Sequence, residues 1–507
     1  MSDTRYYQVG GWRAHIRGPG KHGETQWNSE KPLAESLAGS SSPLKSRISN
    51  EPLELVFGIT HTGASYLYMT EQETRRYTNA MRLPLPRAYP MRIDSFQSVS
   101  PIHFHAVEEL EAKLSRMKPK KGNAPYDTSQ ANRGYTDSNP EPGLKRGHFE
   151  HNRVLYRILQ RTLDLPKYSV PADTRWTQNL RICSLVYNLW SLDHRAVSDR
   201  RRAPRLLDVG FAEARVPDLE YKPGTGVHLS DERNLGLKQG AETTREAFRY
   251  GDSHTMSQDQ IGDKLRELLR LDPRQPTILL IMGEDWTTDI LGSLGVFFHV
   301  EDIRSLIYGS RRDTHQSSSR HNDYDSRRDR RRSRSRSPQR SYAASSDPRR
   351  RPDTRDIPST ERDRPRLYVI DVKELYLTMM EESEIGTYSV SQLAERLGHQ
   401  VNHLSWCAGN EAVQLIQLWK DMISGAAIDE QRELRRDTVT KAQNVFVPPE
   451  ERGKQQNGAS AAAPDTQDDD GDDSDDPNNW QAPPPKPGVA TIDPDEFSDY
   501  GSDSEED

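Results

Sequence analysis

The chain has 507 residues, of which 33% are hydrophobic and 29% charged, and its formal net charge is -7. The length allows two or three domains, but so polar a composition cannot fill them with packed cores, so we expect long disordered segments. The charge is segregated, with positive charge concentrated in 311–366 and negative charge in 465–507. The two cysteines, Cys183 and Cys407, exclude a disulfide framework and a cysteine-rich zinc site, and we expect both to be small buried residues.

The first residues, MSDTRYYQVGG, contain no apolar signal core, and no run approaches the ~20 apolar residues of a membrane span. We therefore expect no membrane association and a cytosolic or nuclear protein.

The amino-terminal third is expected to hold little order. Residues 1–48 lack periodicity and are predicted to be disordered. A partly ordered segment follows over 49–120, with a strand at LELVFGI (53–59) and a helix in SPIHFHAVEELEAKLSRM (100–117), in which Ser100 would be the N-cap. Residues 121–145 are predicted to be a linker.

Order is predicted to return over 146–309. A helix in HNRVLYRILQRTLDL (151–165) precedes three predicted strands, RICSLVYNLWSL (181–192), RLLDVGFAEARV (205–216) and VHLSDE (227–232).

Helices and buried strands then alternate. A capping box of Ser257 and Gln260 starts a helix. The apolar run after Pro276, bounded by Gly283, predicts a strand buried on both faces. Asp289 follows at the start of a helical pattern, where α/β folds place ligands and chemistry. The alternative is a first-turn acid that the helix dipole favours.

Residues 366–425 continue this pattern. RLYVIDVKELYL (366–377) predicts a strand with a helix behind it, Ser389 and Gln392 form a second capping box, and AGNEAVQLIQLWKDMI (408–423) predicts a strongly apolar helix. Three sequential strands followed by alternating helices and strands favour an α/β fold with a mixed sheet covered by helices.

Two low-complexity segments interrupt and follow this domain. The insert at 310–365 contains SRRDRRRSRSRSPQR and is predicted to be disordered. It resembles the arginine–serine segments of RNA-processing proteins, and its arginines suit phosphate contacts that phosphorylation of the serines could switch. We single out Arg331, Arg332, Arg334 and Arg336 as candidate nucleic-acid ligands, the alternative being a solvated basic spacer. Residues 426–507 are predicted to be a disordered acidic tail.

Three pieces of the ordered region carry a family resemblance. They are GEDWTTD, VIDVKELY and WCAGNEA, the last starting at Trp406. Together they resemble the ribonuclease H-like fold of DEDD-type exonucleases, and most of all the fungal exonuclease-like domain named for "good for full DEAD-box protein activity". The resemblance covers roughly 175–309 and 366–425, and AGNEA is its most specific piece.

The resemblance implies a two-metal site in which four acids hold Mg²⁺ or Mn²⁺. Asp289 matches one acid, and Glu411 stands where the family has its last aspartate, so both are candidate catalytic and metal-binding residues. The Asp-x-Glu pair of the first strand is replaced by Val186 and Asn188. Trp406 stands where the general-base histidine would be; it is a candidate to stack on a base, or else an apolar anchor for the last helix.

We therefore expect a protein with an inactive exonuclease-type site that works in RNA-associated binding or scaffolding. The implied partners are RNA and RNA-processing or export proteins, in a nuclear or nucleocytoplasmic location. The alternatives are an active metal-dependent 3'-5' exonuclease, with Mg²⁺ or Mn²⁺ required only in that case, and a protein–protein adaptor without nucleic-acid contact. The alignment further predicts that Asn188, Asp289 and Glu411 converge on one cleft.

Overall fold

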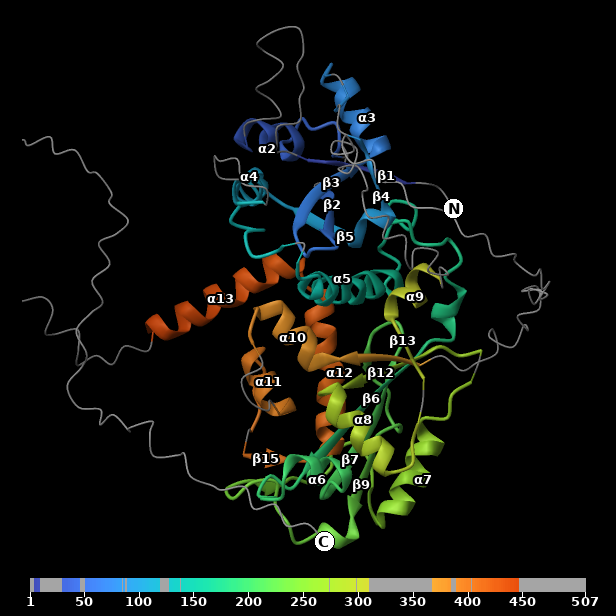
Figure 1. The fold of residues 1–507 in the computed structure, drawn as a ribbon. Helices are drawn as coiled ribbons and strands as arrows, with labels where there is room; N and C mark the ends of the chain where they lie inside the picture. The colour runs from blue at the N-terminus through green and yellow to red at the C-terminus, as the bar shows by residue number, and fades with distance from the viewer. Residues whose placement is uncertain are drawn as a thin grey trace, which may run out of the picture. The chain divides into compact units, whose positions relative to one another are not determined.

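The computed structural model describes residues 4–9, 30–45, 51–118, 127–309, 367–383 and 389–445, with single gaps at 84, 87, 88, 137, 273, 298 and 403, and side chains up to 436. It confirms the α/β class, since helices flank two sheets, one of them mixed (Figure 1). The predicted insert at 310–365, with its four candidate arginines, lies outside these described residues.

The first sheet is antiparallel and has five strands in the order β4-β1-β3-β2-β5. Its strands are β1 (Arg5–Gln8), β2 (Leu53–Thr60), β3 (Ser65–Thr70), β4 (Met91–Arg92) and β5 (Phe96–Phe104), and its helices are α2 (Glu30–Ala38), α3 (Glu71–Ala80) and α4 (Val107–Arg116). The prediction of disorder over 1–48 was therefore wrong at β1 and α2. Tyr6 explains part of this order, because its buried ring packs edge-on against Phe96 with ring centroids 5.6 Å apart.

The helix predicted to begin at Ser100 was also wrong, because Ser100 lies inside β5 and the helix starts only at Val107. β5 pairs along its edge with β2, it contacts α4 and α5 (Glu141–Leu159), and all but one of its nine residues are buried. Burial on both faces removes the period-two pattern that marks a half-buried strand. The predicted linker at 121–145 is corrected as well, because α5 begins inside it.

The second sheet is mixed and follows the order β11-β9-β7-β6-β12-β14-β13, with β8 paired to β7. Its members are β6 (Arg181–Leu189), β7 (Leu206–Arg215), β8 (Glu220–Tyr221), β9 (Val227–Asp231), β11 (Ser253–Met256), β12 (Thr277–Ile281), β13 (Val300–Glu301) and β14 (Leu367–Asp371). β6, β7 and β9 are antiparallel neighbours, whereas β12 runs parallel to β6 and β14 parallel to β12. Strands from both sides of the 310–365 segment thus lie in one sheet.

Helices cover both faces of this sheet (Figure 1). Ile278 and Leu280 of β12 belong to a core that also holds residues of α5, α10 (Val372–Met380) and α12 (Ala408–Ser424). Leu279 and Ile281, on the opposite side of the same strand, belong to a second core with α7 (Gln258–Leu268) and α8 (Glu284–Ser293). The sheet therefore separates α12 from α8.

The predicted capping boxes are confirmed. Ser257 starts α7 by accepting from the backbone N–H of Gln260, and Ser389 starts α11 (Val390–Arg396) in the same way with Gln392. The helix stop at Gly398 is consistent with its φ of +88°.

The start of α12 is held close to the sheet. Gly210 of β7 makes this approach possible, because a Cβ at this position would lie 1.9 Å from the carbonyl oxygen of Ala408. A short parallel pairing of β10 (Thr244–Arg245) with β15 (Ser405–Trp406) fixes the segment that leads into the helix.

The predicted acidic tail begins too early, because α13 (Ile428–Val445) continues the fold past 426. This helix is polar, and its charged side chains find partners on other elements. Asp429 binds Lys113 of α4 and Arg146 of α5, so the segment is ordered by ion pairs that a scan for apolar periodicity does not detect. No helix in the described ranges is both long and apolar enough to span a membrane.

Candidate functional site

Two of the predicted site residues meet between β6 and α12. Asn188 donates a hydrogen bond from Nδ2 to Oε2 of Glu411 at 3.0 Å, and both residues are buried. Gln239 in turn donates from Nε2 to the amide oxygen of Asn188 at 2.7 Å. The amide of Asn188 therefore has both its donor and its acceptor occupied by protein groups.

Glu411 lies in an environment that disfavours charge. Burial raises its pKa, the negative charge of Asp208 raises the pKa further, and the hydrogen bond from Asn188 opposes the rise, which leaves the pKa of Glu411 at about 8. The neutral, protonated form of its carboxyl group is therefore favoured at neutral pH, and a divalent cation would have to displace this proton in order to bind.

Asp289 does not join this pair. It lies on α8, whose Ile290 and Leu291 pack into the core on the opposite face of the sheet. Its Oδ2 atom is 3.5 Å from Nη1 of Arg201, which is an ion contact too long for a strong hydrogen bond. The predicted convergence of Asn188, Asp289 and Glu411 on one cleft is therefore wrong.

Asp371, the aspartate of VIDVKELY, has a structural use. It ends β14 and caps α10, accepting from the backbone N–H groups of Lys373 and Glu374. Its two oxygens also accept from the backbone N–H groups of Gly283 at 3.0 Å and Glu284 at 2.9 Å. This carboxylate therefore joins the starts of α8 and α10.

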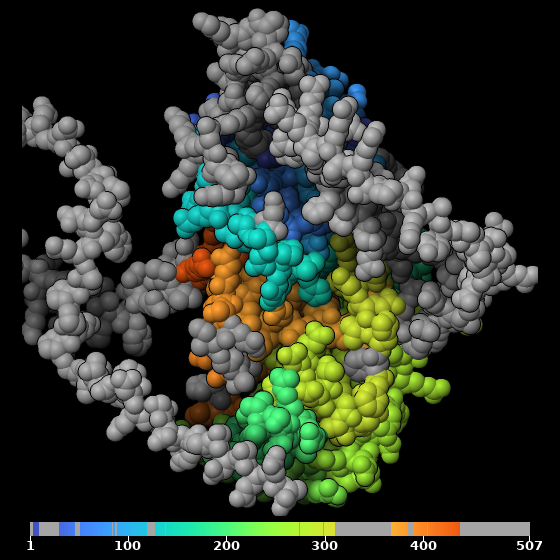
Figure 2. Space-filling view, in the orientation of Figure 1, coloured from blue at the N-terminus to red at the C-terminus, as the bar shows by residue number. Residues whose placement is uncertain are grey.

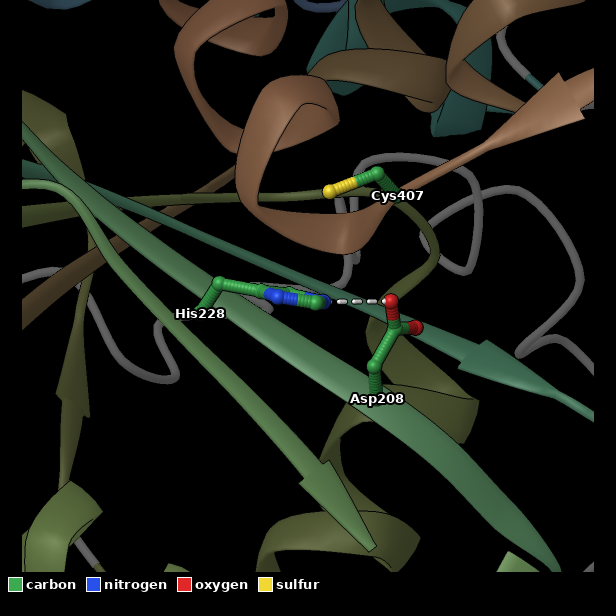
Figure 3. Close-up of side chains that lie close together, drawn as sticks. All are labelled: Asp208, His228 and Cys407. Atoms are coloured by element: carbon green, nitrogen blue, oxygen red, sulfur yellow. Dashed lines mark hydrogen bonds and ion pairs between the residues drawn. The ribbon is translucent and has the colours of Figure 1, made fainter. Parts of the chain in front are cut away.

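A cluster that the sequence did not indicate lies beside Glu411. Asp208 of β7, His228 of β9 and Cys407, directly before α12, each contribute one donor atom, and these atoms all lie within 4.8 Å of one another (Figure 3). Oδ2 of Asp208 is 2.8 Å from Nε2 of His228 and accepts from the backbone N–H of Ala408. All three residues are at most 2% exposed.

The charges of this cluster are coupled. Burial disfavours a charged imidazole at His228, but the hydrogen bond to Asp208 and the proximity of Cys407 outweigh that effect and raise the pKa of His228 to about 9. Sequence inspection did not find the cluster because it depends on strand register. His228 stands opposite Gly210, next to Asp208 on one face, and this pairing cannot be read from residue spacing.

Trp406 is not at a surface where a base could stack. It is 2% exposed, and the guanidinium of Arg245 lies 4.6 Å from its ring centroid. Of the two expectations for this residue, the structure supports the apolar anchor. The prediction that the two cysteines are buried is confirmed, and both are free thiols.

A different surface combines arginines with tryptophans, and we name it the Arg–Trp surface. Arg205 lies over the ring of Trp190 at 4.7 Å, and Arg201 of α6 (Val197–Arg202) lies over Trp286 of α8 at 5.2 Å. These residues follow the carboxyl ends of the neighbouring strands β6 and β12. Figure 2 shows the α6 and α8 segments side by side on one face of the molecule.

No family model matches the chain, and no curated protein matches its sequence.

Proposed function

We propose that this chain is a ribonuclease H-like, exonuclease-related protein that has lost hydrolysis and acts by binding RNA or as a scaffold on RNA. The mixed sheet supports the fold assignment, with three antiparallel strands followed by parallel strands and a final helix on the other face. That arrangement agrees with the one expected from the motif resemblance.

The observation that carries the loss of hydrolysis is the Asn188–Glu411 hydrogen bond. Two-metal hydrolysis needs ionised oxygen ligands that hold both ions about 3.5–4 Å apart. At the first-strand position an amide stands where the resemblance expects a carboxylate, and this amide is hydrogen-bonded to Glu411, the acid of the last motif. Asp289 is on the other face of the sheet, where it pairs with Arg201.

RNA contact is supported by two features. One is the arginine–serine insert, whose composition suits phosphate binding. The other is the Arg–Trp surface, because cationic groups and aromatic faces are the elements that bind single strands without reading sequence. Its location at the carboxyl ends of β6 and β12 is where open α/β sheets bind ligands. A nuclear or nucleocytoplasmic location is part of this proposal.

Titration of fluorescently labelled single-stranded RNA with the full chain at increasing salt concentration tests the proposal. We expect binding at low salt that weakens as salt rises, because phosphate contacts release counterions. Absence of binding at low salt would leave the protein–protein adaptor as the better explanation.

A further inference from the structure

We propose that Asp208, His228 and Cys407 form a buried site for a divalent transition-metal ion, best matched to Zn²⁺, that fastens the start of α12 to β7 and β9. The site is separate from the exonuclease-type position and does not depend on the proposed function.

The donor set identifies the class of ion. One carboxylate oxygen, one imidazole nitrogen and one sulfur lie within 4.8 Å of one another. Sulfur and imidazole donors favour Zn²⁺ and similar ions, whereas Mg²⁺, Ca²⁺ and Mn²⁺ prefer oxygen. With ligand distances of about 2.0–2.3 Å to the ion, three such donors around one Zn²⁺ need only small side-chain movements.

The groups around the cluster hold the ligands as a metal site requires. Nδ1 of His228 is 2.8 Å from Oγ of Ser253, while Nε2 faces Asp208. In the neutral imidazole, the hydrogen bond at Nδ1 fixes the tautomer and directs Nε2 at the ion, which would replace the proton between Nε2 and Asp208. The backbone N–H of Ala408 likewise orients the carboxylate of Asp208.

One atom of the cluster lacks a partner. Oδ1 of Asp208 is buried and has no hydrogen bond among the described residues. A buried carboxylate oxygen without a partner is costly. If Asp208 binds the ion through both oxygens, it supplies two donors, and nitrogen and sulfur complete the four that Zn²⁺ prefers.

Burial shows what the ion would do. Asp208 is 0% exposed, Cys407 1% and His228 2%, so no substrate reaches the cluster and a nucleophilic cysteine–histidine mechanism is excluded. Two of the ligands come from adjacent strands and the third from the residue before α12. The ion would therefore cross-link parts of the chain that are far apart in the sequence. Asp208 is 200 positions away from Ala408, the residue that follows the ligand Cys407.

Metal analysis of the full chain, purified without chelators or metal-affinity resin, tests the site. We expect one zinc ion per chain in the wild-type protein, and loss of that zinc in Cys407→Ser. Cys183→Ser is the matched control, because Cys183 is also a buried free thiol but lies in the apolar core with α7 and α8. This control should keep its zinc.

Two further measurements complete the test, and the first uses only the wild-type protein, so it does not depend on the folding of a variant. Chelation of the wild-type protein should lower Tm by several degrees, and Zn²⁺ alone, but not Mg²⁺, should restore it. Cobalt substitution should give a thiolate-to-metal absorption band that Cys183→Ser retains and Cys407→Ser lacks. A wild-type protein that contains no zinc and whose Tm responds to neither chelator nor Zn²⁺ would overturn the proposal and leave a metal-free Asp208–His228 pair.

Discussion

Asn188 of β6 donates a hydrogen bond to the carboxyl group of Glu411 on α12, at 3.0 Å and away from solvent. The bond joins the sheet to α12, a helix of 17 residues. It also uses two residues that the motif resemblance aligns with metal-binding acids. Under the proposed function, the same contact therefore joins the sheet to the helix and occupies the two positions at which a cation would otherwise bind.

Restoring an acid at the first of these positions should harm the protein. Asn188→Asp would place an ionisable carboxyl group at hydrogen-bond distance from Glu411 in a buried site, where taking a second carboxylate charge out of water is costly. We expect a loss of about 2–4 kcal/mol in the free energy of unfolding at pH 7, measured by urea denaturation. Glu411→Gln, which keeps a neutral polar group, should cost about 1 kcal/mol or less.

Asn139→Asp is the matched control for this change. Asn139 is exposed and accepts from the backbone N–H of Glu141 at the start of α5, a role that aspartate also fills. This substitution should change the free energy of unfolding by no more than about 0.5 kcal/mol. Equal stability of Asn188→Asp and wild type would contradict the contact described for Glu411.

Asp429 should be among the most important charged residues for stability. It lies 3.2 Å from Nζ of Lys113 and 2.7 Å from Nη2 of Arg146, both of which have side chains only 3% exposed. Asp429→Asn would remove the carboxylate partner of Arg146 and leave Lys113 paired only with Glu430, so we expect a loss of about 3–5 kcal/mol in the free energy of unfolding. Asp421→Asn is the control. The side chain of Asp421 is 44% exposed and pairs with His399, so its loss should lower the free energy of unfolding by about 1 kcal/mol or less.

The same residue predicts acid sensitivity. Burial works against the charge of Asp429, but Arg146, Lys113 and Arg432 outweigh burial and lower its pKa. A lowered folded-state pKa means that the stabilisation is complete above the unfolded pKa, about 3.8–4, and is lost as pH falls below it. Tm measured from pH 7 to pH 2.5 should therefore fall more in the wild type than in Asp429→Asn. If the Tm of the wild type and the Tm of Asp429→Asn fell equally with pH, this account would be refuted.

RNA affinity should depend on the Arg–Trp surface. Replacing Arg201 and Arg205 by alanine should weaken binding of single-stranded RNA and reduce the slope of log affinity against log salt by about 1 for each phosphate group that the variant no longer binds. Trp286→Ala should cost about 1–3 kcal/mol if a base stacks there. Fluorescence anisotropy at several salt concentrations measures both effects.

Arg175→Ala provides the control, since its side chain is 84% exposed and it precedes β6 at the opposite end of that strand. It should leave affinity and salt slope unchanged. A comparable loss of affinity in the control would show that RNA binding depends only on the overall charge of the protein.

Metal-dependent cleavage should be absent. Labelled single-stranded RNA incubated with the full chain and Mg²⁺ or Mn²⁺ should stay intact, because Asp289 and Glu411 lie on opposite faces of the sheet. Asp289→Ala should change nothing in this assay. Cleavage that requires the metal and disappears in Asp289→Ala would instead establish an active exonuclease.

Sequence reasoning was most successful where local signals decide structure. The capping boxes at Ser257 and Ser389 located two helix starts, and the apolar run before Gly283 located β12. It failed at β5, where burial on both faces hides the strand period, and at α13, where ion pairs replace an apolar stripe.

The candidate site was predictable only in part. Of the three residues that the resemblance led us to expect in one cleft, the structure brings Asn188 and Glu411 together and leaves Asp289 apart. The sequence could not show that α8 and α12 cover opposite faces of the sheet, because the face on which a helix packs is decided by tertiary contacts. His228 was missed because its proximity to Asp208 arises from strand register.

The pairing of β13 with β14 has a consequence for the length of the chain between them. These strands flank the 310–365 segment in sequence, yet Val300 lies opposite Leu367 and Glu301 opposite Tyr368. The connection between the two strands, which begins with α9 (Ile303–Tyr308), thus joins neighbouring positions in one sheet. Because the entropy of closing a loop grows only slowly with its length, relatives could lengthen, shorten or replace this connection while the sheet beneath it remained unchanged.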